Sequence, residues 1–150
     1  MEYRFADGSD ADFALLCAEL DECLEELVGG KFDRSQYTQY NQTDDIHDVI
    51  LVYDQNEPVG CASYKKYDSE PAEVKRVFIR PQYRGQGISK IMLKKLEMRA
   101  VEQGYRAFIL EAGELLVSAM KLYEVLGYVI VPNYGQYAEM PDSICMRKYL

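Results

Sequence analysis

The chain has 150 residues, 17 of them Lys or Arg and 25 Asp or Glu, and a formal net charge of −8 at pH 7. This length favours a single domain over residues 1–150 that buries a hydrophobic core. The acidic total disfavours a protein whose whole surface docks on nucleic acid or anionic lipid. No apolar run approaches the roughly 20 residues that cross a bilayer, and the N-terminus lacks a signal-peptide core. We therefore expect a cytoplasmic protein with no nucleic-acid or membrane partner.

The charge is unevenly distributed along the chain. Residues 1–74 carry 18 acids and 5 bases, residues 75–106 carry 2 acids and 9 bases, and residues 107–150 carry 5 acids and 3 bases. A segment with a net charge of +7 thus lies near the middle of an acidic protein. It is either a solvated helix face or a local site for an anion.

The four cysteines are Cys17, Cys23, Cys61 and Cys145, and His47 is the only histidine. No two cysteines form a CxxC pair, and a zinc site needs tighter clustering of Cys and His. We therefore expect no metal and four reduced, mostly buried thiols. A single histidine also disfavours Ser-His or Cys-His nucleophilic catalysis.

Apolar residues at helical spacing predict a first helix, which begins at an S-x-x-D capping pattern from Ser9 to Asp12 and ends at Gly29-Gly30. Residues 3–5 are a candidate for a short strand before this helix. The later elements expected are a short helix at 34–40, strands at 48–53, 59–67 and 72–79, a long helix at 87–103, a strand at 107–110, a helix at 115–126, and strands at 128–131 and 143–149. This order predicts an α/β (α+β) fold in which a mixed sheet of about 6–7 strands is flanked by about 4 helices.

The segment most informative about chemistry is V-F-I-R-P-Q-Y-R-G-Q-G-I-S at 77–89, where a strand leads through a two-glycine loop into a helix. The first N–H groups of a helix lack intrahelical partners and carry the positive end of its dipole. Glycines let a phosphate approach the backbone, so the pattern is typical of an anion cradle. The spacing matches neither G-x-x-x-x-G-K-[ST] nor G-x-G-x-x-G, which disfavours a P-loop enzyme and a Rossmann site.

Two blocks of the sequence resemble a known family. R-G-Q-G-I-S at 84–89, after the strand end V-F-I-R-P, is similar to the R-x-x-G-x-G/A signature of the GNAT superfamily, the Gcn5-related N-acetyltransferases. A-M-K-L-Y-E-V-L-G-Y at 119–128 resembles the A-x-x-L-Y-x-x-L-G-F/Y block of that family, in the order the fold requires. The E-x-K-R strand at 73–76 also resembles many bacterial members. Two positions depart from the family pattern. Ser89 occupies a position where the family has Gly or Ala, and Leu116 occupies a position where family members often have a polar residue that contacts CoA.

The resemblance implies acetyl-CoA as a cosubstrate and the GNAT fold, in which the strand before the loop splays from the next parallel strand. The pantetheine of acetyl-CoA then pairs with the exposed main chain, and the loop amides bind its pyrophosphate. The residues implied in acetyl-CoA binding are Val77, Phe78, Ile79, Arg84, Gly85, Gln86, Gly87, Ile88, Ser89 and Lys90. Core packing of the Val77 and Ile79 side chains is compatible with this role, because the ligand uses main chain.

The resemblance also implies direct acetyl transfer to a primary amine of a small molecule or peptide. Tyr123 matches the family tyrosine that often donates a proton to the CoA sulfur, although a tyrosine that only packs on its helix fits the same pattern. The candidates for the general base are Glu73 and Glu111. The alternative is that neither carboxylate is the base and that water molecules relay the proton. An exposed charge or a salt bridge with Arg76 is the alternative for Glu73.

The N-terminal half, which shapes the acceptor pocket in this family, is acidic here. Asp44, Asp45 and Asp48 favour a cationic acceptor, and a solvated acidic face is the alternative. Tyrosines bunch at Tyr37, Tyr40, Tyr134 and Tyr137, where they are candidates for lining that pocket or for a homodimer contact, with singly exposed side chains as the alternative. The competing function is a non-catalytic acyl-CoA-binding or regulatory module on the same fold.

Overall fold

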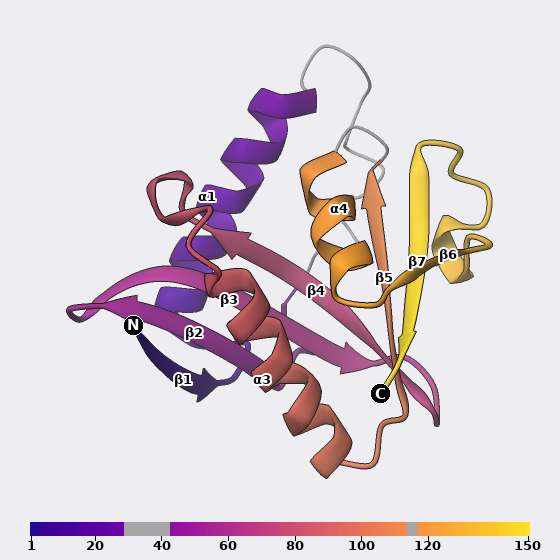
Figure 1. Ribbon diagram of the computed structural model, residues 1–150, viewed down its shortest axis with the longest axis horizontal. Coiled ribbons are helices and arrows are strands. Elements are labelled where there is room, and N and C mark those ends of the chain that lie inside the picture. Colours follow the sequence, from indigo (N-terminus) through magenta and orange to yellow (C-terminus); the bar gives the residue numbers. More distant parts are fainter. Residues whose placement is uncertain (29–42, 114–116) are drawn as a thin grey trace. The chain divides into compact units, whose positions relative to one another are not determined.

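The computed structural model describes residues 1–28, 43–113 and 117–150 and is drawn as a ribbon in Figure 1. The strands are β1 (Glu2–Ala6), β2 (Asp48–Asp54), β3 (Glu57–Lys66), β4 (Pro71–Ile79), β5 (Ala107–Gly113), β6 (Val129–Val131) and β7 (Ser143–Tyr149). The α-helices are α1 (Ala11–Val28), α3 (Ile88–Glu102) and α4 (Val117–Val125), with 3₁₀ turns at Pro81–Tyr83 and Gly135–Tyr137. The helix expected at 34–40 lies outside the described residues, as do Tyr37, Tyr40 and Leu116.

Seven strands form one mixed sheet in the order β1-β2-β3-β4-β5-β7-β6, which confirms the predicted fold class. β4 and β5 run parallel, whereas the pairs β1–β2, β2–β3, β5–β7 and β6–β7 are antiparallel. The parallel register joins residues 71–73 to residues 107–109, at the amino ends of both strands. Such a short register agrees with the splayed central strands that the resemblance implies.

The chain forms two compact units. Unit 1 comprises Met1–Lys65 and Val74–Leu96, and unit 2 comprises Lys66–Glu73 and Glu97–Leu150. Both β4 and α3 continue from one unit into the other. That residues 1–150 act as one domain stays a prediction.

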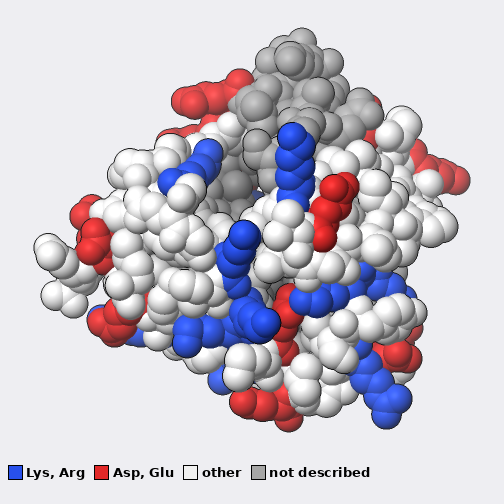
Figure 2. Space-filling model, viewed as in Figure 1, with Lys and Arg blue, Asp and Glu red and all other residues white. Residues whose placement is uncertain are grey.

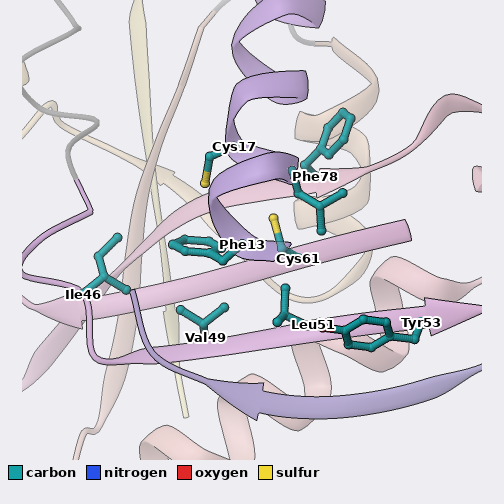
Figure 3. Packing of buried hydrophobic residues seen from close by; sticks show 9 residues of the cluster. Phe13, Cys17, Ile46, Val49, Leu51, Tyr53, Cys61 and Phe78 are labelled. Carbon is teal, nitrogen blue, oxygen red and sulfur yellow. The ribbon is translucent and has the colours of Figure 1, made fainter. Parts of the chain in front are cut away.

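The core of unit 1 lies between α1 and strands β2 to β4 (Figure 3). Phe13 and Leu16 project from α1 at helical spacing and are fully buried. They meet Val49 and Leu51, which alternate along β2 so that both face α1. Burial of each large apolar side chain contributes about 1.5–3 kcal/mol, and these contacts hold α1 on the sheet.

The start of α1 differs from the predicted capping pattern. Asp10 is the N-cap, because its Oδ1 accepts hydrogen bonds from the backbone N–H of Asp12 at 2.8 Å and of Phe13 at 3.1 Å. Ser9 instead donates its hydroxyl to Asp7. The prediction that Ser9 caps the helix is therefore wrong, because a carboxylate one residue later satisfies the free N–H groups.

Unit 2 is built on the antiparallel strands β5 and β7, which lie side by side in Figure 1. The run from Ala107 to Leu110 is buried, as its continuous apolar character predicts. Asn133 closes the connection from β6 to β7, since its Nδ2 donates to the carbonyls of Tyr137, Met140 and Ser143 at 3.0–3.2 Å. Across both units, none of the described helices is long and apolar enough to cross a membrane.

Candidate active site

A two-glycine loop leads from β4 to α3, as predicted. Gly85 and Gly87 have φ angles of 77° and 79°, a region that favours glycine. A Cβ added to either would meet no described atom within 4 Å, so the loop backbone is open on that side. Because α3 begins at Ile88, its unpaired first-turn amides follow directly. The loop and the helix terminus together can cradle an anion.

Two side chains that sequence reasoning missed anchor the approach to this loop. Arg80 donates from Nε and an Nη atom to the two carboxylate oxygens of Glu19, at 2.8 and 2.7 Å. This bidentate pair lowers the pKa of Glu19. The Tyr83 hydroxyl donates to Asp54 at 2.9 Å. No local pattern reveals these contacts, because the partners lie 61 and 29 residues apart in the chain.

The predicted acetyl-CoA residues of the loop differ in their exposure. Arg84, Gln86 and Lys90 are exposed, Ser89 is half-buried and Ile88 is buried. The Arg84 side chain is already oriented, since its Nε donates to the Ile79 carbonyl at 2.9 Å and its guanidinium lies 5.9 Å from the Phe78 ring. Ile88 is thus placed to fix the helix start, and the exposed side chains are those placed to meet a ligand.

The basic segment at 75–106 is not one continuous patch. Lys75 and Arg76 are buried, and Arg80 is paired with Glu19. The exposed bases of the segment are Arg84, Lys90, Lys94, Lys95 and Arg106. Figure 2 shows Lys and Arg side chains on the face that carries α3 in Figure 1. The positive charge that a ligand meets is therefore smaller than the formal +7.

Residues 77–79 of β4 follow an irregularity at Arg76, whose φ is 57°. Val77 is half-buried, and Phe78 and Ile79 are 3% and 6% exposed. The side chains of Phe78 and Ile79 therefore belong to the core. Gly60 on β3 makes room for Ile79, since an added Cβ would lie 2.5 Å from its Cδ1.

The predicted catalytic side chains gather in unit 2. Glu73 pairs with Ile109 across β4 and β5, and Glu111 pairs with Cys145 across β5 and β7. Because paired residues and residues two apart on a strand share a face, Glu73, Glu111 and Cys145 lie on one side of the sheet. Glu73 is 1% exposed. The guanidinium of Arg76, the alternative partner of Glu73, pairs with Asp21 at 3.0 Å.

Tyrosines cover the two carboxylates. The Tyr134 hydroxyl donates to Glu73 Oε2 at 2.7 Å. Burial raises the pKa of Tyr137, and the charges of Glu73 and Glu111 raise it further. Burial and then Glu111 likewise raise the pKa of Tyr123. We name these five residues, Glu73, Glu111, Tyr123, Tyr134 and Tyr137, the acid–tyrosine cluster.

The rings of the acid–tyrosine cluster continue to neighbouring tyrosines. Tyr134 packs edge-on against Tyr67 and Tyr137, with centroids 5.2 and 5.7 Å apart. Tyr123 packs edge-on against Tyr128 at 5.5 Å. Tyr137 is 1% exposed, so its side chain does not present a dimer surface or stand singly exposed. Sequence reasoning noted the tyrosine pair at 134 and 137 but not its contact with Glu73.

Two further predictions concern charge and metal. Asp45, part of the acidic loop before β2, is paired with Lys65 at 3.1 Å, so that loop is less negative than its sequence implies. Within residues 1–28, 43–113 and 117–150, no three His, Cys, Asp or Glu side chains are grouped to hold a metal ion.

The chain is similar to known acetyltransferases. It is 30% identical over 137 residues to the IAA acetyltransferase of Azospirillum brasilense, covering 90% of this chain and 88% of that protein. A crystal structure from Klebsiella pneumoniae subsp. pneumoniae MGH 78578 matches it with a TM-score of 0.82 and 29% identity, over 99% of this chain and 97% of that one. The PaiA N-acetyltransferase from Thermoplasma acidophilum, solved with coenzyme A, shares the fold at a TM-score of 0.74 and 16% identity over both whole chains. Residues 13–128 match the model of the acetyltransferase (GNAT) family, and the chain belongs to that family.

Proposed function

We propose that this chain is an acetyl-CoA-dependent N-acetyltransferase that transfers acetyl directly to a primary amine of a small molecule or peptide. The observation that carries the proposal is the open two-glycine loop at the start of α3, in a member of the acetyltransferase family. The crystallisation of a protein of the same fold with coenzyme A supports this choice of cosubstrate.

The loop binds the pyrophosphate of acetyl-CoA through the main-chain amides of residues 84–89. Arg84 and Lys90 add positive charge, and the half-buried Ser89 hydroxyl is a further donor. The pantetheine pairs with the main chain of Val77, Phe78 and Ile79, whose side chains serve the core. Because the Ile79 carbonyl already accepts from Arg84, this pairing relies mainly on the groups before it.

The acid–tyrosine cluster performs the proton transfers. The amine nitrogen attacks the thioester carbonyl, a C–N bond forms, and the C–S bond then breaks. Tyr123 donates its proton to the leaving sulfur, and burial, which raises its pKa, keeps the phenol protonated at neutral pH. Glu73 or Glu111 accepts the proton that the amine loses. Glu111 is half-buried, and Glu73 accepts a hydrogen bond from Tyr134. The single substitutions Glu73→Gln and Glu111→Gln test which carboxylate is the base, because only loss of the base should lower kcat strongly.

The acceptor proposed is cationic. A group of two carboxylates and tyrosine rings favours an ammonium group, through charge and through cation–π attraction of about 0.5–2 kcal/mol for each ring. Glu73 and Glu111 supply the charge, and Tyr134 and Tyr137 supply the rings. A homodimer stays a prediction.

Acetyl-CoA binding tests the loop assignment. Acetyl-CoA at 100 times its Kd should stabilise the protein by about 2.7 kcal/mol, seen as a rise in Tm. The double variant Gly85→Val/Gly87→Val should lose that rise. Gly104→Val is the matched control, because Gly104 also has a positive φ of 94° and open space but lies after α3. An unchanged rise in the double variant would contradict the assignment.

A further inference from the structure

Two cysteines of unit 1 lie together in its core. Cys17 projects from α1 and Cys61 from β3, and Figure 3 shows their sulfur atoms on facing sides of the gap between the two elements. Both thiols belong to the same buried cluster of side chains. Cys61 is fully buried, whereas Cys17 is 7% exposed, so Cys17 is the thiol that a small molecule reaches first.

A buried arginine lies beside this pair. The Nη2 of Arg76 donates to the Cys17 carbonyl at 2.8 Å, which holds the guanidinium beside this residue. The Cys61 thiol donates to the main-chain carbonyl of Arg76, with the Sγ 3.3 Å from the oxygen. Arg76 is 8% exposed, and its Nε has no hydrogen-bond partner among the described residues. A desolvated guanidinium next to a thiol stabilises the thiolate.

The surroundings give the two thiols different acidities. The neighbouring Cys61 and Arg76 lower the pKa of Cys17 to about 7 against the opposing effect of burial. The neighbouring Cys17 and burial raise the pKa of Cys61. The other charged groups that face the pair, Asp21 and Glu19 from α1, oppose ionisation only weakly. An ionised thiol beside a neutral one is the arrangement of an attacking and a resolving cysteine.

We propose that Cys17 and Cys61 form an oxidisable dithiol, which hydrogen peroxide converts into an intramolecular disulfide between α1 and β3. The Cys17 thiolate attacks one peroxide oxygen, so that an S–O bond forms, the O–O bond breaks and hydroxide leaves. Cys17 is thereby oxidised to sulfenic acid and the peroxide is reduced. Cys61 then attacks the Cys17 sulfur, an S–S bond forms, and the leaving hydroxide takes the Cys61 proton. Two thiols and one peroxide yield one disulfide and two waters.

Peptide mapping of the oxidised full-length chain tests the proposal without reference to its enzymatic activity. The reduced protein is treated with hydrogen peroxide at pH 7, blocked with N-ethylmaleimide and digested without reductant for mass spectrometry. The expected product is a monomer in which the peptides of Cys17 and Cys61 are linked, with the loss of two hydrogens that dithiothreitol restores. Cys23, half-buried on the same helix, should stay alkylated.

Variants resolve the order of the two steps. In Cys61→Ser, dimedone should trap a sulfenic acid on Cys17, and in Cys17→Ser the Cys61 thiol should stay unmodified. Arg76→Met should slow the reaction of Cys17 at pH 7 by about tenfold, because less thiolate is present. Cys145→Ser is the matched control, since Cys145 is a buried thiol of unit 2, and it should cross-link as the natural chain does.

Three results on the natural chain would overturn the proposal, so it does not depend on any variant folding. They are peroxide that leaves both thiols free, a link from Cys17 to Cys23 or to a second chain, and sulfinic acid on Cys17 without a link. Loss of the cross-link in Cys145→Ser would also contradict it.

Discussion

Replacing Tyr134 by Phe removes the hydroxyl that donates to the buried Glu73 carboxylate at 2.7 Å and keeps the ring. The edge-on contacts with Tyr67 and Tyr137 therefore persist. Because Glu73 is 1% exposed, bulk water does not replace the lost donor. A hydrogen bond to a charged group is worth about 1.5–3 kcal/mol, and we expect a loss of stability of that size. For a chain of this length it corresponds to a fall in Tm of about 3–10 °C.

Urea unfolding at pH 7 measures this loss as a lower midpoint with an unchanged slope. Tyr149→Phe is the control: its side chain is 70% exposed, and its stability should change by no more than about 0.5 kcal/mol. In a Glu73→Met background the Tyr134 hydroxyl has lost this acceptor, so Tyr134→Phe should cost at least about 1 kcal/mol less there. An equal cost in both backgrounds, or a cost no larger than that of the control, would refute the reasoning.

The other predictions concern catalysis, pH and the core. Tyr123→Phe should lower kcat by about 10²–10⁴-fold with acetyl-CoA binding intact, because only the proton donor is lost; equal kcat values would contradict its role as the acid. Arg80 lowers the pKa of Glu19, so their pair stabilises the fold above pH 4.5 and the benefit fades as the pH falls below that value. Glu19→Gln should therefore destabilise the protein at pH 7 and cost less as the pH falls below 4.5, measured by urea unfolding, and a pH-independent effect would contradict this. Glu57→Gln removes a 67% exposed partner of Arg80 and should change the stability little. Phe13→Ala should cost about 3–5 kcal/mol in the same assay, and a cost below 1 kcal/mol would contradict its place in the core.

Features encoded by neighbouring residues were predictable from the sequence. The strand–loop–helix pattern at 77–89 depends on adjacent residues, and the structure confirms its two open glycines and the helix that follows. The N-terminal cap of α1 was not predictable from the pattern, because serine and aspartate side chains are both suited to accept from free N–H groups. The choice between them depends on Asp7, which binds the Ser9 hydroxyl.

Contacts between distant segments were not predictable. Tyr134 meets Glu73 across 61 residues of chain, and Arg76 meets Cys17 across 59, so no local spacing reveals either contact. The number of exposed basic side chains at 75–106 was likewise not predictable from the formal charge of that segment. Lys75 and Arg76 add to the basic segment in the sequence, but both side chains are buried because β4 is covered on both faces at these positions.

The most direct test of the proposed function is thiol release from acetyl-CoA in the presence of a panel of primary amines. The panel comprises polyamines, aminoglycosides, lysine-like side chains and peptide N-termini. We predict thiol release that requires an amine, matches the acetylated product by mass spectrometry and falls at least about 100-fold in Tyr123→Phe. Tight acetyl-CoA binding without acetylation of any amine would contradict the proposal and favour a non-catalytic acyl-CoA-binding module.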